Sequence, residues 1–272
     1  MFPKTNLHTH TTYCDGKLTP LEMVRAAIDK NLEVIGFSGH AHMAEVGHEW
    51  CMSPEDTAAY RAAVAALGRD YADQIEVVTG IEQDVFSDFS TEGYQYVIGA
   101  VHFVKKDGEY VPIDHSEELF GDAVNRIYGG DVYAFARDFY ETTSSAPTAT
   151  GADIAAHFDL FKKFNSGGKF FDENDKRYRN AALDALREAA KSGVIFEINT
   201  GGAYRGCNTE FYPAPFILRE LKELGGRITF SSDSHDARSL CYGFPAARKI
   251  AKECGFKTAW TWKDGGFKEF KI

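Results

Sequence analysis

Short apolar runs rich in β-branched and aromatic residues alternate with longer amphipathic stretches along most of this chain of 272 residues. Such runs are typical of buried strands, and the amphipathic stretches predict helices that cover them. The pattern predicts seven strands, at residues 4–8, 32–38, 75–81, 96–101, 153–157, 194–199 and 227–232. The clearest helices are predicted over residues 174–191 and 213–224.

Two further helices have clear start signals in the sequence. Thr19 fits an N-cap, Pro20 fits the first helical position, and Glu22 stands where a capping box requires a carboxylate. The segment 53–56, Ser-Pro-Glu-Asp, starts a second helix in the same way. Because strands and helices alternate, we expect βαβ units and a parallel sheet.

Seven βα units in a chain of this length predict an α/β fold whose sheet closes, or nearly closes, into a TIM-like barrel. An open doubly wound sheet would call for a glycine-rich phosphate loop after an early strand, and the sequence has none. We expect one domain over residues 1–272. The irregular segment at about 105–150 is expected to be an insertion, helical in part, that covers one face of the barrel.

Composition and charge narrow the class of partner. Hydrophobic residues make up 44% of the chain and aromatic residues 14%, which is enough for a sizeable core. A net charge of −10 without a basic block argues against a nucleic-acid or acidic-membrane partner. No apolar run is long enough to cross a bilayer and no signal-like start is present, so we expect a cytoplasmic protein. The oligomeric state does not follow from the sequence.

Imidazoles and carboxylates gather where the predicted strands end. His8 and His10 end the first strand two residues apart, so both side chains point to the same face. The same rule places further candidates after the other strands: Asp15, His40, His42, Glu82, His102, His157, Asp233 and His235. Because the carboxyl ends of the strands of a parallel barrel meet at one face, we expect a single site there.

This set of side chains predicts a metal centre. A cluster rich in imidazole and carboxylate, without thiolate, suits Zn²⁺, Mn²⁺ or Fe²⁺. About nine ligands exceed what one tetrahedral or five-coordinate ion needs, so two or three divalent ions are predicted. Glu82 comes from a middle strand and is the natural bridging carboxylate. A hydroxide between two such ions is a strong nucleophile at neutral pH.

The ordered set of these motifs resembles the polymerase and histidinol phosphatase (PHP) family of metal-dependent phosphoesterases, and within it most of all the histidinol-phosphatases. Supporting segments are residues 11–16, 99–103 and 157–164, together with Glu197-Ile198-Asn199-Thr200 and Arg205-Gly206. The resemblance spans essentially the whole chain. It implies a distorted (β/α)7 barrel that holds three metal ions.

By this resemblance, the three ions divide the ligands among them. His8, His10, Glu82 and Asp233 would hold the first ion, and Glu82 with His102 and His157 the second. Asp15, His40 and His235 would hold the third. Some members of the family have His where this chain has Asp15.

The resemblance also implies a reaction, the hydrolysis of L-histidinol phosphate to L-histidinol and phosphate in histidine biosynthesis. The substrate would be a small phosphate monoester whose leaving alkoxide needs a proton, and Asp159 and His42 are the candidate donors. Asp159 can instead orient His157, and His42 can be a substrate contact or a spare ligand. Arg205, in a glycine-rich loop, is a candidate for bidentate phosphate binding.

Two other functions stay open at this point. One is a PHP phosphoesterase that acts on a nucleotide or a general monoester. The other is a non-catalytic PHP module that binds metal for stability or for a partner, as domains appended to polymerases can. A His-x-His pair also occurs in metal-dependent amidohydrolases, but those usually need a carboxylated lysine after strand four, where this chain has His102.

Overall fold

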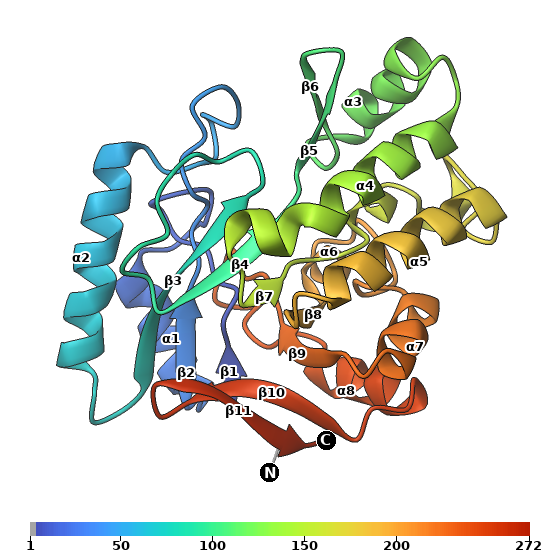
Figure 1. Ribbon diagram of the computed structural model, residues 1–272. Coiled ribbons are helices and arrows are strands. Elements are labelled where there is room, and N and C mark those ends of the chain that lie inside the picture. The colour runs from blue at the N-terminus through green and yellow to red at the C-terminus, as the bar shows by residue number, and fades with distance from the viewer. Residues whose placement is uncertain (1–3) are drawn as a thin grey trace.

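A seven-stranded parallel sheet forms the centre of the computed structural model, which describes residues 4–272 (Figure 1). Its strands follow in sequence order: β1 (Thr5–Asn6), β2 (Val34–Phe37), β3 (Glu76–Asp84), β4 (Tyr96–Ala100), β7 (Ile154–Ala155), β8 (Ile195–Asn199) and β9 (Arg227–Ser231). A parallel bridge between Thr9 and Ser234 joins the chain just after the first and last strands, so the sheet closes on itself there. The predicted α/β barrel of seven strands is confirmed.

Helices surround the sheet and connect its strands. The longer ones are α1 (Pro20–Asp29), α2 (Pro54–Asp70), α4 (Val132–Thr150), α5 (Lys176–Ala190), α7 (Pro215–Glu223) and α8 (Phe244–Glu253). Shorter turns are α3 (Glu117–Asp122), η1 (Ala123–Ile127), η2 (Leu160–Lys162), η3 (Ser166–Gly168) and α6 (Gly201–Tyr204). The predicted capping box is present, because Thr19 accepts from the backbone of Glu22 and the Glu22 carboxylate accepts from the backbone of Thr19.

The segment that the sequence leaves irregular differs from the prediction in its second half. Residues 132–150 form the continuous helix α4, which packs along α5 and against β4. Thr142, Thr143 and their neighbours are weak helix formers, but their hydroxyls donate to carbonyls of the preceding turn, at 2.9 Å for Thr142 and 2.8 Å for Thr143. Only the hairpin of β5 (Phe103–Lys106) and β6 (Glu109–Pro112), with α3 and η1 after it, stands apart from the barrel in Figure 1.

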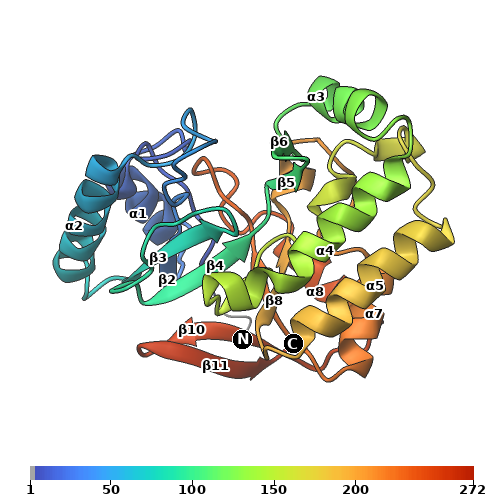
Figure 2. The same cartoon turned by 45° about the horizontal axis from the view of Figure 1, so that its top comes forward.

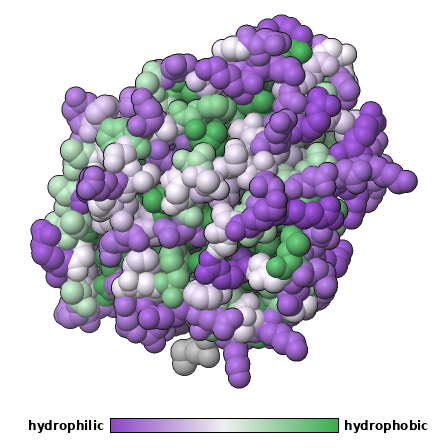
Figure 3. All heavy atoms as spheres, in the orientation of Figure 1, coloured by the Kyte–Doolittle hydropathy of each residue, from purple (hydrophilic) through white to green (hydrophobic). Residues whose placement is uncertain are grey.

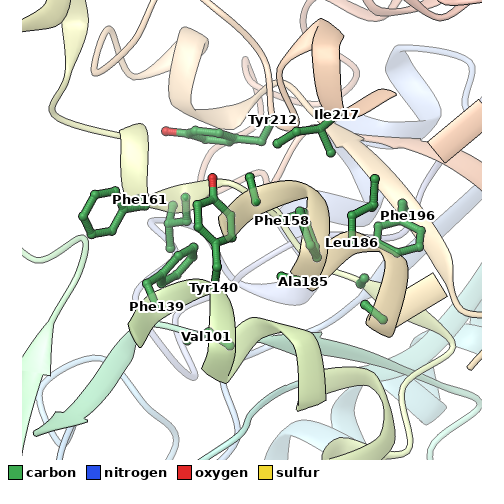
Figure 4. Packing of buried hydrophobic residues seen from close by; sticks show 14 of the residues in the cluster. Val101, Phe139, Tyr140, Phe158, Phe161, Ala185, Leu186, Phe196, Tyr212 and Ile217 are labelled. Atoms are coloured by element: carbon green, nitrogen blue, oxygen red, sulfur yellow. The ribbon is translucent and has the colours of Figure 1, made fainter. Parts of the chain in front are cut away.

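The main core lies between the sheet and helices α4 and α5. Figure 4 shows Phe139 of α4 beside Phe161, and Tyr140 beside Phe158, within this cluster. The Tyr140 hydroxyl donates to the Tyr178 hydroxyl at 2.9 Å, so the polar ends of both rings are paired inside the core. Burial of these large rings fixes α4 and α5 on the barrel wall.

A single tyrosine fills the space between the first strands of the barrel. The Tyr96 hydroxyl donates to the carbonyls of Leu7 and Phe37, the latter at 2.9 Å. Its ring lies where side chains at positions 36 and 80 would project, so a Cβ at Gly36 or Gly80 would collide with it. Tyr96 therefore links β1, β2 and β4 across the interior, and the two glycines leave room for it.

The C-terminal hairpin closes the other end of the barrel. It consists of β10 (Thr258–Lys263) and β11 (Gly266–Lys271), and Figure 2 shows it beneath the central strands. Trp262 packs with Leu7 and Tyr96, and its indole N–H donates to Glu76 at 2.7 Å. This end is therefore sealed, and any site must open at the carboxyl ends of the strands.

Hydrophilic residues cover most of the face seen in Figure 3, with apolar side chains mainly in its recesses. None of the helices within residues 4–272 is both long and apolar enough to cross a membrane.

Candidate metal centre

Nine of the side chains predicted as metal ligands converge at the carboxyl ends of the barrel strands. They lie in or after six of the strands: His8 and His10 after β1, Asp15 in the next loop, His40 after β2, Glu82 in β3, His102 after β4, His157 after β7, and Asp233 and His235 after β9. Most of them are buried, while Asp15 and His235 reach the surface in part. The structure therefore brings residues separated by up to 227 positions into one cluster.

Glu82 lies at the centre of this cluster. Its Oε2 is 3.1 Å from His8 Nε2 and 3.1 Å from His40 Nδ1. Its Oε1 faces the other way, 3.1 Å from His157 Nε2 and 3.6 Å from His102 Nε2. The two oxygens thus serve two different sets of imidazoles, as a carboxylate that bridges two ions must.

Two further carboxylates continue the cluster on the side of His10. Asp233 Oδ1 is 3.2 Å from His10 Nε2 and 3.6 Å from His235 Nδ1. Asp15 Oδ2 is 2.9 Å from His235 Nε2, and its Oδ1 is 3.7 Å from His40 Nε2. The surrounding imidazoles, His40 first, keep the pKa of Asp15 below its ordinary value, although burial alone would raise it.

Three overlapping groups of these residues have ligand atoms within 4.8 Å of one another: His8, His10 and Asp233; His40, Glu82 and His102; and His10, Asp15, His40 and His235. His10 and His40 each belong to two groups, so the division among ions expected from the resemblance is not the only one that the geometry offers. His157 joins through Glu82 Oε1.

Three buried atoms in the cluster test whether a cation fits. His8 Nε2, His10 Nε2 and Glu82 Oε2 have no hydrogen-bond partner within residues 4–272. Buried polar atoms are nearly always paired, so three unpaired lone-pair donors that face one another indicate a place for a positive ion. The donor set is nitrogen and oxygen only, because burial raises the pKa of the nearby Cys14 thiol to about 12.

The buried carboxylate of Glu197, in β8, accepts hydrogen bonds from two histidines of this cluster. Its Oε2 accepts from His8 Nδ1 at 2.9 Å and from Ser231 Oγ at 2.6 Å. Its Oε1 accepts from the His157 backbone N–H and from Asn199 Nδ2, both at 2.7 Å. With Nδ1 of His8 donating to Glu197, Nε2 carries the lone pair that faces Glu82.

Asp84 orients the His102 ring in the same way, through a hydrogen bond to Nδ1. Its Oδ2 lies 3.0 Å from His102 Nδ1 and accepts from the His102 backbone N–H at 2.8 Å. Burial alone would lower the pKa of His102, but in the metal-free protein the hydrogen bond to Asp84 raises it to about 9. The sequence contains a signal for Asp84, since it lies two residues after Glu82 on the same strand face, but the strand pattern ended at residue 81 and missed it.

A cavity of about 260 Å³ opens beside the cluster. Seven candidate ligands and Arg205 line it, together with seven further residues: Trp50, Phe103, Pro112, Asp114, His115, Leu160 and Lys163. The volume is near the lower end for small-molecule sites, roughly 300–1,000 Å³. A small substrate therefore fits better than a polymer.

Of the three residues predicted for catalysis, Asp159, His42 and Arg205, the first two do not line this cavity. Asp159 is fully buried, and its Oδ2 accepts from the Ala214 backbone N–H at 2.8 Å and pairs with Lys162 Nζ at 3.2 Å. His42 turns its Nδ1 toward the Met52 carbonyl at 3.3 Å. In both cases the chain leaves the strand after the preceding histidine, so the two-residue alternation no longer applies.

Arg205 does line the cavity, but its guanidinium already has a partner. Nη2 donates to Asp233 Oδ2 at 2.9 Å and Nη1 donates to the Asp233 carbonyl at 3.1 Å. Burial alone would lower the pKa of Arg205, but Asp233 raises it. Arg205 thus fixes the Asp233 oxygen that does not face His8 and His10.

Comparison with known proteins shows which family this chain resembles. The PHP domain matches residues 6–201. A protein of Deinococcus radiodurans named "Probable histidinol-phosphatase" is 30% identical over 261 residues, which cover 92% of this chain and 94% of that protein. A histidinol-phosphatase of Bacillus subtilis is 23% identical over 266 residues and covers 89% and 97% of the two chains.

A solved structure shows a similar fold. The histidinol phosphate phosphatase of Lactococcus lactis, complexed with zinc, L-histidinol and phosphate, matches with a TM-score of 0.71 at 22% identity. The match covers 97% of this chain and 98% of that one, and it supports the same barrel fold.

Proposed function

The chain belongs to the PHP domain family, and from this premise we propose that it is a metal-dependent phosphomonoesterase that hydrolyses L-histidinol phosphate to L-histidinol and phosphate. The observation that carries the proposal is the group of unpaired buried atoms on His8, His10 and Glu82 beside a small cavity. The named relatives supply the substrate, since they match this chain over nearly its whole length.

We assign the nine converging residues as ligands of three divalent ions, zinc, manganese or iron. His8, His10, Glu82 and Asp233 would hold the first, Glu82, His102 and His157 the second, and Asp15, His40 and His235 the third. When bound, such ions neutralise charge on the phosphoryl oxygens and supply a hydroxide nucleophile at neutral pH.

The protein's own groups position the substrate and the ligands. Glu197 and Asp84 fix the tautomers of His8 and His102, so that the ring nitrogens that face Glu82 carry lone pairs. Arg205 holds Asp233 and places its charge at the cavity wall, where it attracts the phosphoryl group.

The leaving alkoxide needs a proton, and the two donors expected from the sequence lie outside the cavity. We assign this role to His115, which lines the cavity and is not one of the nine residues assigned as ligands. Asp159 becomes a positioning residue, since with Lys162 it ties the turn after His157 to the loop before α7.

A substrate panel on one preparation tests the proposal. Purified protein, stripped with chelator and reloaded separately with Zn²⁺, Mn²⁺ or Fe²⁺, should release phosphate from L-histidinol phosphate far faster than from nucleotides or sugar phosphates. Metal content is measured on the same samples. Equal rates on all esters would refute the substrate, and phosphate release by the stripped protein at the loaded rate would refute the metal-centred reaction.

A further inference from the structure

Two residues that line the cavity, Asp114 and Lys163, form a partly buried ion pair. Lys163 Nζ donates to Asp114 Oδ2 at 3.0 Å and to the Asp114 carbonyl at 2.7 Å. The Asp114 and Lys163 side chains are 25% and 14% exposed, and both line the cavity. The pair thus faces the space that a substrate would fill and not bulk solvent.

The two members of this pair are not equally available to a ligand. Lys163 already has two acceptors, both from Asp114. Within residues 4–272, the Asp114 carboxylate accepts from no other side chain, so Oδ1 is left without a donor. An ionised oxygen in a partly buried position gains most from a cationic donor.

The other residues that line the cavity indicate which further groups a ligand of Asp114 would carry. Trp50 and Phe103 line the same cavity, with their ring planes 10° apart and their centroids 6.1 Å apart, and Pro112 and Leu160 add further apolar groups. The Trp50 ring also packs against His40 and His102. A ligand here would offer flat or apolar groups to these side chains and one positive charge to Asp114. Its phosphate would lie against the metal ligands and Arg205.

We propose that Asp114 binds the ammonium group of the substrate and thereby selects phosphate monoesters of amino alcohols. This inference rests on the proposed function, because it takes the phosphate to lie at the metal cluster. Lys163 holds the Asp114 side chain in place and keeps it ionised.

The test compares two esters that differ in one group. L-Histidinol phosphate carries the amine, and imidazolylpropanol phosphate lacks it. The wild-type enzyme should favour the first in kcat/KM by about 30-fold or more, the range for one buried charge pair. Asp114→Asn should remove most of this preference, and competitive inhibition by L-histidinol should weaken by a similar factor.

Two matched variants accompany Asp114→Asn. Asp114→Glu keeps the charge and should retain part of the preference. Glu109→Gln removes an exposed carboxylate of the same hairpin, one that pairs with Arg126, and should leave both substrates unaffected. Circular dichroism and thermal unfolding show whether each variant is folded, and the glutamate variant decides the question if the asparagine variant is not.

The outcomes separate this inference from the proposed function. If the wild type hydrolyses both esters equally well, or if Asp114→Asn lowers both equally, Asp114 does not read the amine and the inference is overturned. If neither ester is hydrolysed while another phosphate ester is, the proposed substrate itself fails. A preference that survives in Asp114→Asn and disappears in Lys163→Met would assign recognition to the lysine, against the proposal.

Discussion

Glu197→Gln is the substitution that probes the site most directly, because it changes one atom of a fully enclosed carboxylate. Both oxygens of Glu197 accept two hydrogen bonds each, and the side chain is 1% exposed. A glutamine must place an NH₂ group where one of these oxygens stands. In either orientation of the amide, this NH₂ group faces two hydrogen-bond donors of the protein.

The two orientations of the amide differ in what they cost. With NH₂ at Oε1, the His157 backbone N–H and Asn199 lose their acceptor, which costs about 1–3 kcal/mol for each buried donor. With NH₂ at Oε2, the Ser231 hydroxyl can rotate to accept, but His8 must accept at Nδ1 and carry its proton on Nε2. The second orientation is cheaper for the fold and removes the lone pair that faces Glu82.

We therefore expect Glu197→Gln to lower metal affinity by about 10- to 100-fold, while stability in the metal-free state falls by about 1–3 kcal/mol. Affinity is measured by competition with a chelator of known affinity, and stability by urea unfolding of the stripped protein. Glu76→Gln is the matched control, since Glu76 also accepts a 2.7 Å hydrogen bond, from Trp262, but at the sealed end of the barrel.

The control should lose stability and keep its metal affinity. If Glu197→Gln binds metal as tightly as the wild type, the tautomer of His8 is not set by Glu197 and the reasoning is wrong. If both variants lose affinity together, the effect comes from the fold as a whole.

Three further predictions concern the cavity and the loop behind it. Lys162→Met should destabilise the protein by about 3–5 kcal/mol in urea unfolding, because it leaves Asp159 buried without its partner. Adding Asp159→Asn should recover part of this loss. If the losses of the two single variants simply add in the double variant, the pairing is contradicted. Burial alone would raise the pKa of Asp114, but Lys163 and His102 lower it to about 2 from 3.8. The lowered pKa of Asp114 should therefore contribute about 2 kcal/mol of stability that is complete above about pH 4 and is lost as the pH falls through about 2. Urea unfolding of the stripped protein at several pH values should show that the free energy of unfolding of Asp114→Asn falls less steeply at acid pH than that of the wild type. His115→Ala should slow hydrolysis of L-histidinol phosphate by about 100-fold or more but have little effect on p-nitrophenyl phosphate, whose leaving group needs no proton; equal losses on both substrates would exclude His115 as the donor.

The parts of the structure that depend on strand ends follow from the sequence. Buried strands are apolar runs, and in a parallel barrel their carboxyl ends meet, so the convergence of His8, Glu82 and His157 could be predicted from order alone. The helix α4 could not, because Pro147 and a run of Thr and Ser oppose helix formation locally, and packing against α5 overrides them.

Side chains in the loops could be predicted only in part. Spacing predicts direction while the chain remains extended, but after His157 it turns into the short helix η2, which carries Asp159 away from the cavity. Asp114 and Lys163 lie 49 positions apart and meet through a hairpin whose fold the sequence did not reveal. Glu197 was visible only as part of a family-like segment, because its role depends on which ring nitrogen lies opposite.

The tyrosine at the centre of the barrel also restricts the order in which this sequence can evolve. Any side chain larger than glycine at position 36 or 80 would occupy the space of the Tyr96 ring. A smaller residue at 96 would first have to appear, and it would give up the hydrogen bonds to Leu7 and Phe37. The three positions are therefore expected to change together between lineages, with the tyrosine replaced before either glycine.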